Sequence, residues 1–418
     1  MKEDFKLLLI YLFVSALFAS SNAVAGNWNS SSKGKIAKVE GTINLFVPDD
    51  VMRLFNSASP QEKIKHCGAK SDFSYKEIEK LSLKPPIRIF GYNSRMDNEK
   101  KVEGAEQAKL YGLFLSDAIT DSWVREDNVK QQRVLNSVFA WANAGALTKT
   151  KPCAKNGIRS EGCTAWKKKD GKDASDEMDH STTQMVMMHI AYGYYMALVE
   201  FKPNDPKHKV IQAWINRFFK RNQRPTNIYI GYDLGYVWPR LMEKEINPKI
   251  NLSSKTLLKK GLNGIDKLLL KDGSIKDRTT RGNRALWYHH TGLIEIIGTL
   301  EIARKHGFKI SKSLEERIEK AGEIFIRGYE NHSYMDKWAK TAHNSVFTPG
   351  KQKFRDNLKT PNGNAWFYIF SYRHPNSQFT KKLETILNKH PKNGRRDAYF
   401  GFGLGCIYAV AKDMRTKN

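Results

Sequence analysis

The sequence is poor in cysteine, and the spacing of its few cysteines excludes a common kind of metal site. The four, Cys67, Cys153, Cys163 and Cys406, are not arranged like the ligands of a zinc site. Cys153 and Cys163 bracket a polar loop that a disulfide could close, and the alternative is four free, partly buried thiols. Beyond residue 25 there is no apolar run long enough to cross a bilayer. We therefore expect no membrane span in the mature protein.

The motifs of nucleotide-dependent and serine-hydrolase chemistry are also missing. The chain contains no P-loop and no serine-nucleophile elbow. We also expect no cofactor. His180 closely follows Asp176, Glu177 and Asp179, a grouping that could suggest a metal site. Such clusters are more often solvated loop residues than ligands, and we expect no metal there.

The N-terminal residues have the order of a secretory signal. Lys2 and Lys6 precede an apolar run over residues 7–18, and small residues follow at 21–26. We expect cleavage after Ala25, with Ala23 as the alternative. The sequence therefore predicts a signal peptide over 1–25 and a periplasmic or secreted protein. Residues 26–418 are expected to form a single domain, with an irregular lead-in over 26–90.

Acidic residues are scarce relative to basic ones. The chain has 43 Asp and Glu against 70 Lys and Arg, a formal net charge of +27. A strongly cationic protein commonly binds a polyanion. Outside the cytoplasm we expect that partner to be an acidic polysaccharide rather than nucleic acid. The alternative is a lysine-rich compositional bias that serves only solubility.

Apolar residues recur at helical spacing through most of the chain beyond residue 105. Helices are predicted over 184–201, 208–222, 255–270, 284–306 and 314–329. Ser313 and Glu316 have the spacing of a capping box, and Gly307 has the position of a helix C-terminal residue. No sustained alternation predicts a large sheet. We expect an all-α fold of antiparallel helical hairpins.

The segment with the most chemical information is residues 271–290. If one helix includes them, Arg281 and Tyr288 lie two turns apart on the same face, with Arg284 one turn from Tyr288. Two cations beside a phenol favour the phenolate, which can remove a proton that the phenol can later return. The alternative is that both arginines are surface helix charges and that Tyr288 is a half-buried core residue.

Three segments together resemble a known family. Arg281-Gly-Asn-Arg284-Ala-Leu-Trp-Tyr288-His289 follows Arg-x-x-Arg-Ala-Leu-x-Tyr-His after an Asp272-Gly273 turn, Leu135–Leu147 follow Leu-Asn-x-x-x-Ala-Trp-Ala-x-Ala-Gly-Ala-Leu, and Ala365-Trp366 begin an aromatic run. In order and approximate spacing they resemble the alginate lyases of polysaccharide lyase family five, over roughly residues 90 to 375. The resemblance implies an α/α toroid, an incomplete barrel of antiparallel helical hairpins that encloses a cleft.

The same resemblance implies a reaction and the residues that perform it. Members of the family cleave an acidic polyuronate such as alginate or polymannuronate by β-elimination. One group neutralises the uronate carboxylate, a base removes the hydrogen at C5, and an acid protonates the departing O4. Carried over by motif, Arg281 and Asn227 bind the carboxylate and Tyr288 transfers the proton. Arg284 and His289 are expected to bind substrate.

Two further matches have less specific interpretations. Trp141 could be a platform on which a sugar ring stacks, and its helical context makes a core tryptophan an equal alternative. Asn331-His-Ser-Tyr334 repeats a wording of the family, but it follows Tyr288 instead of preceding it. We interpret that match as a coincidence.

The sequence departs from the family pattern at Ile228, which stands where the family has histidine. Isoleucine can neither neutralise a carboxylate nor transfer a proton. His180, His189, His289 and His290 are candidates to replace that histidine. The departure also leaves two alternatives open, a lyase for another polyuronate such as glucuronan and a non-catalytic polyuronate-binding protein with the same fold.

Overall fold

The structure, a computed structural model, describes residues 41–69, 71–90, 104–150, 154–155, 158–159, 177–221, 234–339, 350–353, 364–389, 397 and 402–417. They belong to one compact unit, Lys38–Asn418. The predicted signal peptide and the lead-in before residue 41 lie outside the described residues. The rest of the lead-in is not irregular as predicted, because helices occupy most of residues 49–81. None of the described helices is long and apolar enough to cross a membrane.

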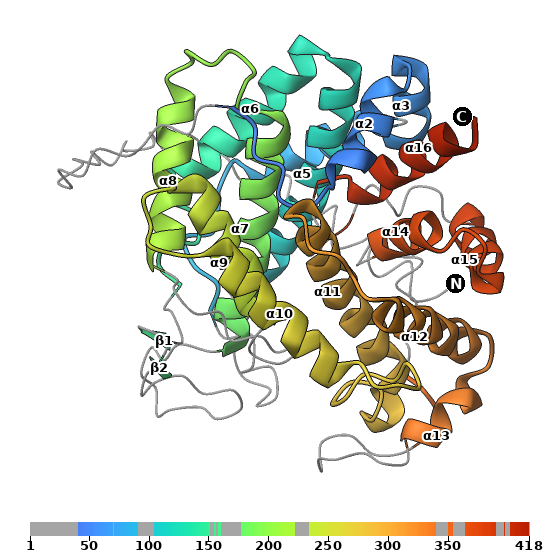
Figure 1. The fold of residues 1–418 in the computed structure, drawn as a ribbon. Coiled ribbons are helices and arrows are strands. Elements are labelled where there is room, and N and C mark those ends of the chain that lie inside the picture. Colours follow the sequence, from blue (N-terminus) through green and yellow to red (C-terminus); the bar gives the residue numbers. More distant parts are fainter. Residues whose placement is uncertain are drawn as a thin grey trace, which may run out of the picture. The chain divides into compact units, whose positions relative to one another are not determined.

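The secondary structure of the described residues is almost entirely helical, as the sequence predicts (Figure 1). The first helices are short: α2 Asp49–Ser57, α3 Pro60–Cys67 and α4 Phe73–Leu81. Longer ones follow: α5 Ala105–Arg125, α6 Asn128–Asn143, α7 Glu177–Ala197, α8 Lys207–Arg221, α9 Leu234–Ile246, α10 Ser254–Leu268, α11 Ala285–Lys305 and α12 Lys312–Glu330. The last α-helices are α13 Asp336–Ala339, α14 Ala365–Arg373, α15 Gln378–Lys389 and α16 Leu404–Lys417. The described residues also form the 3-10 helices η2 Gly282–Arg284 and η3 His332–Met335. Strands β1 Ala154–Lys155 and β2 Ile158–Arg159 form a minimal antiparallel pair.

Helices adjacent in sequence pack against each other as hairpins. Short turns join α5 to α6 and α11 to α12, and each pair is in contact. The helix α11 also packs against α9, α10 and α14, so nearly all its side chains are buried and its sequence is apolar all round. In Figure 1 the first helices of the described part, α2 and α3, lie beside the last helix, α16.

A disulfide between Cys67 and Cys406 joins α3 covalently to the last described helix, α16. Cys67 ends α3, Cys406 lies in the first turn of α16, and 339 positions separate them in the sequence. This disulfide was not predicted and contradicts the expectation of four free thiols, whereas the expected Cys153–Cys163 loop is not tested. Cys153 and Cys163 themselves lie outside the described residues.

Helix ends agree with the predicted signals in one case and differ in another. Gly307 follows the last turn of α11 with φ +78°, a left-handed conformation that suits glycine. The predicted capping box at Ser313 is wrong because α12 begins earlier, at Lys312. Ser311 is the N-cap residue, and its Oγ accepts a hydrogen bond from the N–H of Leu314 at 3.3 Å.

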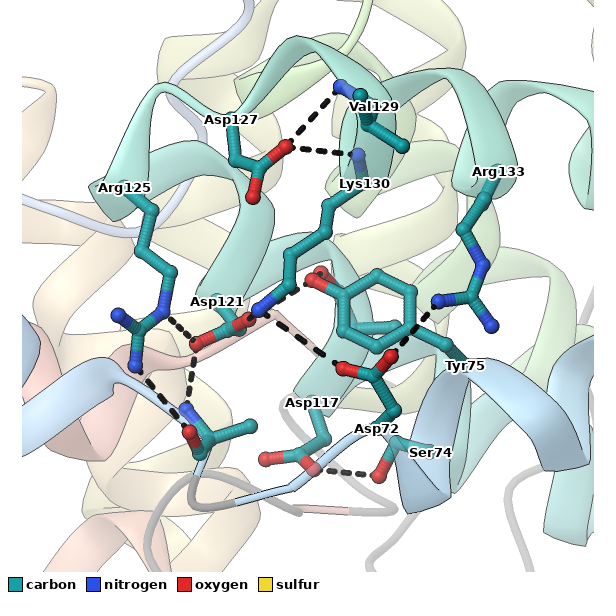
Figure 2. Close-up of polar contacts among 12 residues, drawn as sticks. Asp72, Ser74, Tyr75, Asp117, Asp121, Arg125, Asp127, Val129, Lys130 and Arg133 are labelled. Carbon is teal, nitrogen blue, oxygen red and sulfur yellow. Dashed lines mark hydrogen bonds and ion pairs between the residues drawn. The ribbon is translucent and has the colours of Figure 1, made fainter.

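A buried carboxylate, Asp121, links α5 to the helices around it (Figure 2). One of its oxygens accepts hydrogen bonds from the backbone N–H of Ala69 and from Nε of Arg125, each at 2.6 Å. The other accepts from the Tyr75 hydroxyl at 2.9 Å and from Lys130 Nζ at 3.0 Å. Burial alone would raise the pKa of Asp121, but these donors hold it below its usual value. The loop that follows Cys67 is thereby fixed to the helical core.

Candidate active site

The turn that leads into the candidate site is fixed by Asp272 and Gly273. Gly273 has φ +85°, and a Cβ there would lie 2.6 Å from the backbone nitrogen of Ala321, so only glycine fits. Asp272 Oδ1 accepts from the N–H and hydroxyl of Ser274 at 3.0 and 2.6 Å. Its Oδ2 accepts from Trp338 Nε1 at 3.1 Å. The predicted Asp-Gly turn therefore anchors this segment to both α12 and α13.

Arg281 and Tyr288 do not share a helix, contrary to the sequence interpretation. Arg281 precedes η2, Gly282 has φ +51°, and α11 begins only at Ala285. The two side chains nevertheless meet, with the Arg281 guanidinium carbon 4.3 Å from the centroid of the Tyr288 ring. Arg281 Nε also donates to the carbonyl of Asp277 at 2.6 Å. The predicted pair is brought together by a bent segment rather than by helical spacing.

A second arginine, Arg278, lies close to this pair and was not predicted from the sequence. Its side chain is buried, and its guanidinium carbon lies 5.7 Å from the centroid of the Tyr288 ring. Burial and the neighbouring charge of Arg281 lower the pKa of Arg278 to about 10, while Glu295 opposes the shift. Arg278 remains a cation at neutral pH. The sequence feature that could have indicated Arg278 as a site residue is its spacing of three residues from Arg281.

His289 is a structural residue of this site, and the expectation that it binds substrate is corrected. Its ring is completely buried. Nε2 lies 2.8 Å from the carbonyl of Ala321, so Nε2 carries the proton. Nδ1 therefore accepts from the Thr279 hydroxyl at 2.8 Å, and that oxygen accepts from the N–H of Ile275 at 2.7 Å. Burial lowers the pKa of His289 to about 4, which keeps the ring neutral. His289 holds residues 275–279 against α12.

The other candidate histidines in the described residues are also buried. His290 accepts a hydrogen bond from Trp366 Nε1 at 3.1 Å and packs against the ring of Phe325. This contact joins two of the sequence segments that carry the family resemblance. His180 and His189 are buried on α7.

The remaining predicted site residues are distributed as follows. Arg284 is exposed at the residue before α11, one turn from Tyr288. Trp141 is completely buried and stacks on Tyr111 with ring centroids 3.9 Å apart. A sugar cannot reach that indole, so Trp141 is the core tryptophan of the alternative interpretation. Asn227 and Ile228 lie outside the described residues.

Gln352 joins the start of α11 to a distant part of the chain. Its buried amide accepts from the N–H of Leu286 and donates to the carbonyl of Gly282, both at 3.0 Å. It thus satisfies one of the N–H groups that a helix N-terminus leaves without an intrahelical partner. No group of three His, Cys, Asp or Glu side chains able to hold a metal ion occurs in the part of the chain that the structure describes.

Comparison with known proteins identifies the fold. No family model and no curated protein matches the sequence. Two solved structures of alginate lyase A1-III complexed with tetrasaccharide are similar in fold. The match to the tyrosine-to-phenylalanine variant has 13% sequence identity and a TM-score of 0.51, and it covers 79% of this chain and 86% of the lyase chain. The match to the histidine-to-alanine variant has 14% sequence identity and a TM-score of 0.48, and it covers 79% of this chain and 87% of the lyase chain. The chain has an alginate lyase-like fold, the expected α/α toroid.

Proposed function

We propose that this protein is a polysaccharide lyase that cleaves an acidic polyuronate of the alginate or polymannuronate type by β-elimination. The observation that carries the proposal is the contact of Arg281 with Tyr288, with Arg278 buried beside the same ring. It provides a phenol and two cations at one end of α11. A phenol can transfer a proton, and a cation can neutralise the adjacent carboxylate.

The reaction removes a very weakly acidic hydrogen. The hydrogen at C5 of a uronate is adjacent to an ionised carboxylate, whose charge opposes formation of a carbanion. A guanidinium that binds the carboxylate in two places offsets that charge where it develops. The C5–H electron pair then forms the C4–C5 double bond, the C4–O4 bond breaks, and O4 leaves with its electron pair and takes up a proton.

Each residue has a role in this scheme. Arg281 binds the uronate carboxylate, and Tyr288 removes the C5 proton as phenolate and returns a proton to O4 as phenol. Arg284, exposed at the start of the same helix, binds a neighbouring carboxylate. Asn227 is the motif match for a further carboxylate ligand.

The charge and the N-terminal sequence support the same function. A net charge of +27 attracts a polyanion over long range. The signal-like residues 1–25 would export the enzyme to the periplasm or the medium, where such polymers are found. Affinity for the polymer should therefore fall steeply as salt is added.

The decisive experiment is to mix the mature protein with alginate, polymannuronate, polyguluronate and glucuronan and follow ultraviolet absorbance. A lyase forms a C4–C5 double bond conjugated with the carboxylate, so absorbance rises with each cleavage. A rise with glucuronan alone would identify the substrate alternative left open by Ile228. Salt-sensitive binding to these polymers without any rise would identify a non-catalytic binding protein and overturn the proposed reaction.

A further inference from the structure

A pocket of about 500 Å³ opens beside the candidate site and has no role in the proposed chemistry. Its lining includes His332, Ser333, Asp336, Ala339, Lys351 and Gln352. Its volume is in the usual range for small-molecule sites. Two of its residues, His332 and Ser333, belong to the Asn-His-Ser-Tyr segment that the sequence alone left without a function.

The pocket and the Arg281 turn are parts of one local structure. Gln352 forms one wall of the pocket and holds the backbone of both Gly282 and Leu286. The N–H of Lys353 donates to the carbonyl of Asn283 at 2.6 Å, and α13, which provides Asp336 and Ala339, packs on η2. A ligand in the pocket is therefore next to the turn that carries the proposed carboxylate-binding arginine.

The segment that carries His332 and Ser333 is held firmly. Asn331 Oδ1 accepts from the N–H and the hydroxyl of Ser333, at 3.1 and 2.8 Å. Tyr334 packs edge-on against Trp338 with ring centroids 5.6 Å apart, and Met335 is buried. The polar side chains of the pocket are thus displayed on a fixed frame, which limits the entropy lost when a ligand binds.

The lining has the chemistry of a site for an acidic sugar. Lys351 provides an exposed cation for a carboxylate. Ser333, which is exposed, and His332 and Asp336, which are partly exposed, provide donors and acceptors for ring hydroxyls. A polyuronate presents one carboxylate and two free hydroxyls on each internal unit, and this set can recognise both.

We propose that this pocket is a subsite that binds an acidic sugar unit of the polymer away from the bond that is cleaved. The inference rests on the proposed polyuronate substrate, and it adds a second contact point on the chain. A polymer long enough to occupy both places gains affinity that a short oligomer does not.

The test is equilibrium binding of uronate oligomers of defined length, from dimer to octamer, to full-length mature protein. Tyr288→Phe is used as the background so that oligomers survive the titration, and cleavage by the unsubstituted protein is followed in parallel. Lys351→Met removes the pocket cation. Lys353→Met is the matched control, since this lysine is two residues away, also exposed, and outside the pocket. Ser333→Tyr fills the pocket without changing charge.

Affinity should rise at the oligomer length that first reaches the pocket. Lys351→Met and Ser333→Tyr should each remove that rise, a loss of about three- to tenfold for long oligomers and none for short ones, as expected when the net contribution of about one hydrogen bond is lost. Lys353→Met should keep it. Equal losses at every length, an equal loss from Lys353→Met, or no binding would overturn the subsite. Length-dependent binding without an unsaturated product would overturn the lyase and retain the subsite.

Discussion

The guanidinium carbon of Arg281 lies 4.3 Å from the centroid of the Tyr288 ring, although the two residues do not share a helix. Arg281 precedes the 3-10 helix η2, and Tyr288 lies in α11, which follows η2. The contact therefore depends on the bend at Gly282 and on the groups that fix it. Gln352 holds that bend from one side, and His289 holds the preceding residues against α12. The predictions below test the pair and the framework around it.

Replacing Tyr288 with Phe should nearly abolish lyase activity while leaving the fold unchanged. The substitution keeps the ring and its contact with Arg281 and removes only the hydroxyl. If that hydroxyl transfers the proton, kcat should fall by about 10²- to 10⁴-fold with little change in affinity for the polymer. Steady-state rates on the best polyuronate would measure this, and full activity in the variant would place the chemistry on another residue.

The guanidinium of Arg281 should not be replaceable by an ammonium. Arg281→Lys keeps the positive charge but loses the planar pair of donors that fits a carboxylate. We expect kcat/KM to fall by about tenfold or more. The matched control is Arg327→Lys, an exposed arginine that lies 5.6 Å from the ring centroid of Tyr334. Equal effects of the two substitutions would argue against a bidentate contact at Arg281.

The helices of this protein were predictable because their apolar residues recur at a period near 3.6. The predicted range 208–222 corresponds to α8, and 255–270 to α10. The predicted range 284–306 agrees with α11 within one residue at each end. The conditional extension of that helix to Arg281 was wrong because Gly282 and Asp277 adopt positive φ, which hydrophobic periodicity does not report. The burial of Trp141 could not be predicted either, because a helical pattern does not show whether an apolar side chain faces the core or a substrate cleft.

Contacts between distant parts of the chain could not be predicted in the same way. The partner of Cys67 lies 339 positions away, and cysteine spacing carries no information about that distance. The burial of Arg278 beside Tyr288 is also not predictable from the sequence, because it depends on the packing of the folded chain. The pocket beside η3 likewise requires the packing of α13 on η2, which only the folded chain shows.

Loss of the disulfide between Cys67 and Cys406 should lower the free energy of unfolding by about 2–5 kcal/mol. The bond closes a loop that contains nearly the whole described chain. Without it, α3 and α16 would separate freely on unfolding. Chemical denaturation of a Cys67→Ser, Cys406→Ser double variant would measure the loss. Reductant should destabilise the unsubstituted protein by at least as much. A further effect of reductant on the double variant would reveal a second disulfide, as the Cys153–Cys163 loop predicts.

The last prediction concerns acid stability and the carboxylate of Asp121. Four donors surround it, two of them cationic, and they hold its pKa below the ordinary value of about 4. A carboxyl whose pKa is lower in the folded state stabilises the fold fully above its unfolded pKa. That contribution is lost as pH falls through the folded pKa. The protein should therefore lose stability progressively below about pH 4.

Asp121→Asn tests this directly, because it keeps the shape and removes the charge. At pH 7 the variant should lose about 3–5 kcal/mol of unfolding free energy, since Arg125 and Lys130 lose their buried partner. The difference should shrink as pH falls, because protonated Asp121 then resembles Asn. Asp266→Asn, at an exposed carboxylate paired with Arg317, is the control and should cost at most about 1 kcal/mol. Denaturation curves between pH 3 and 7 would decide, and a pH-independent difference would show that Asp121 acts through packing alone.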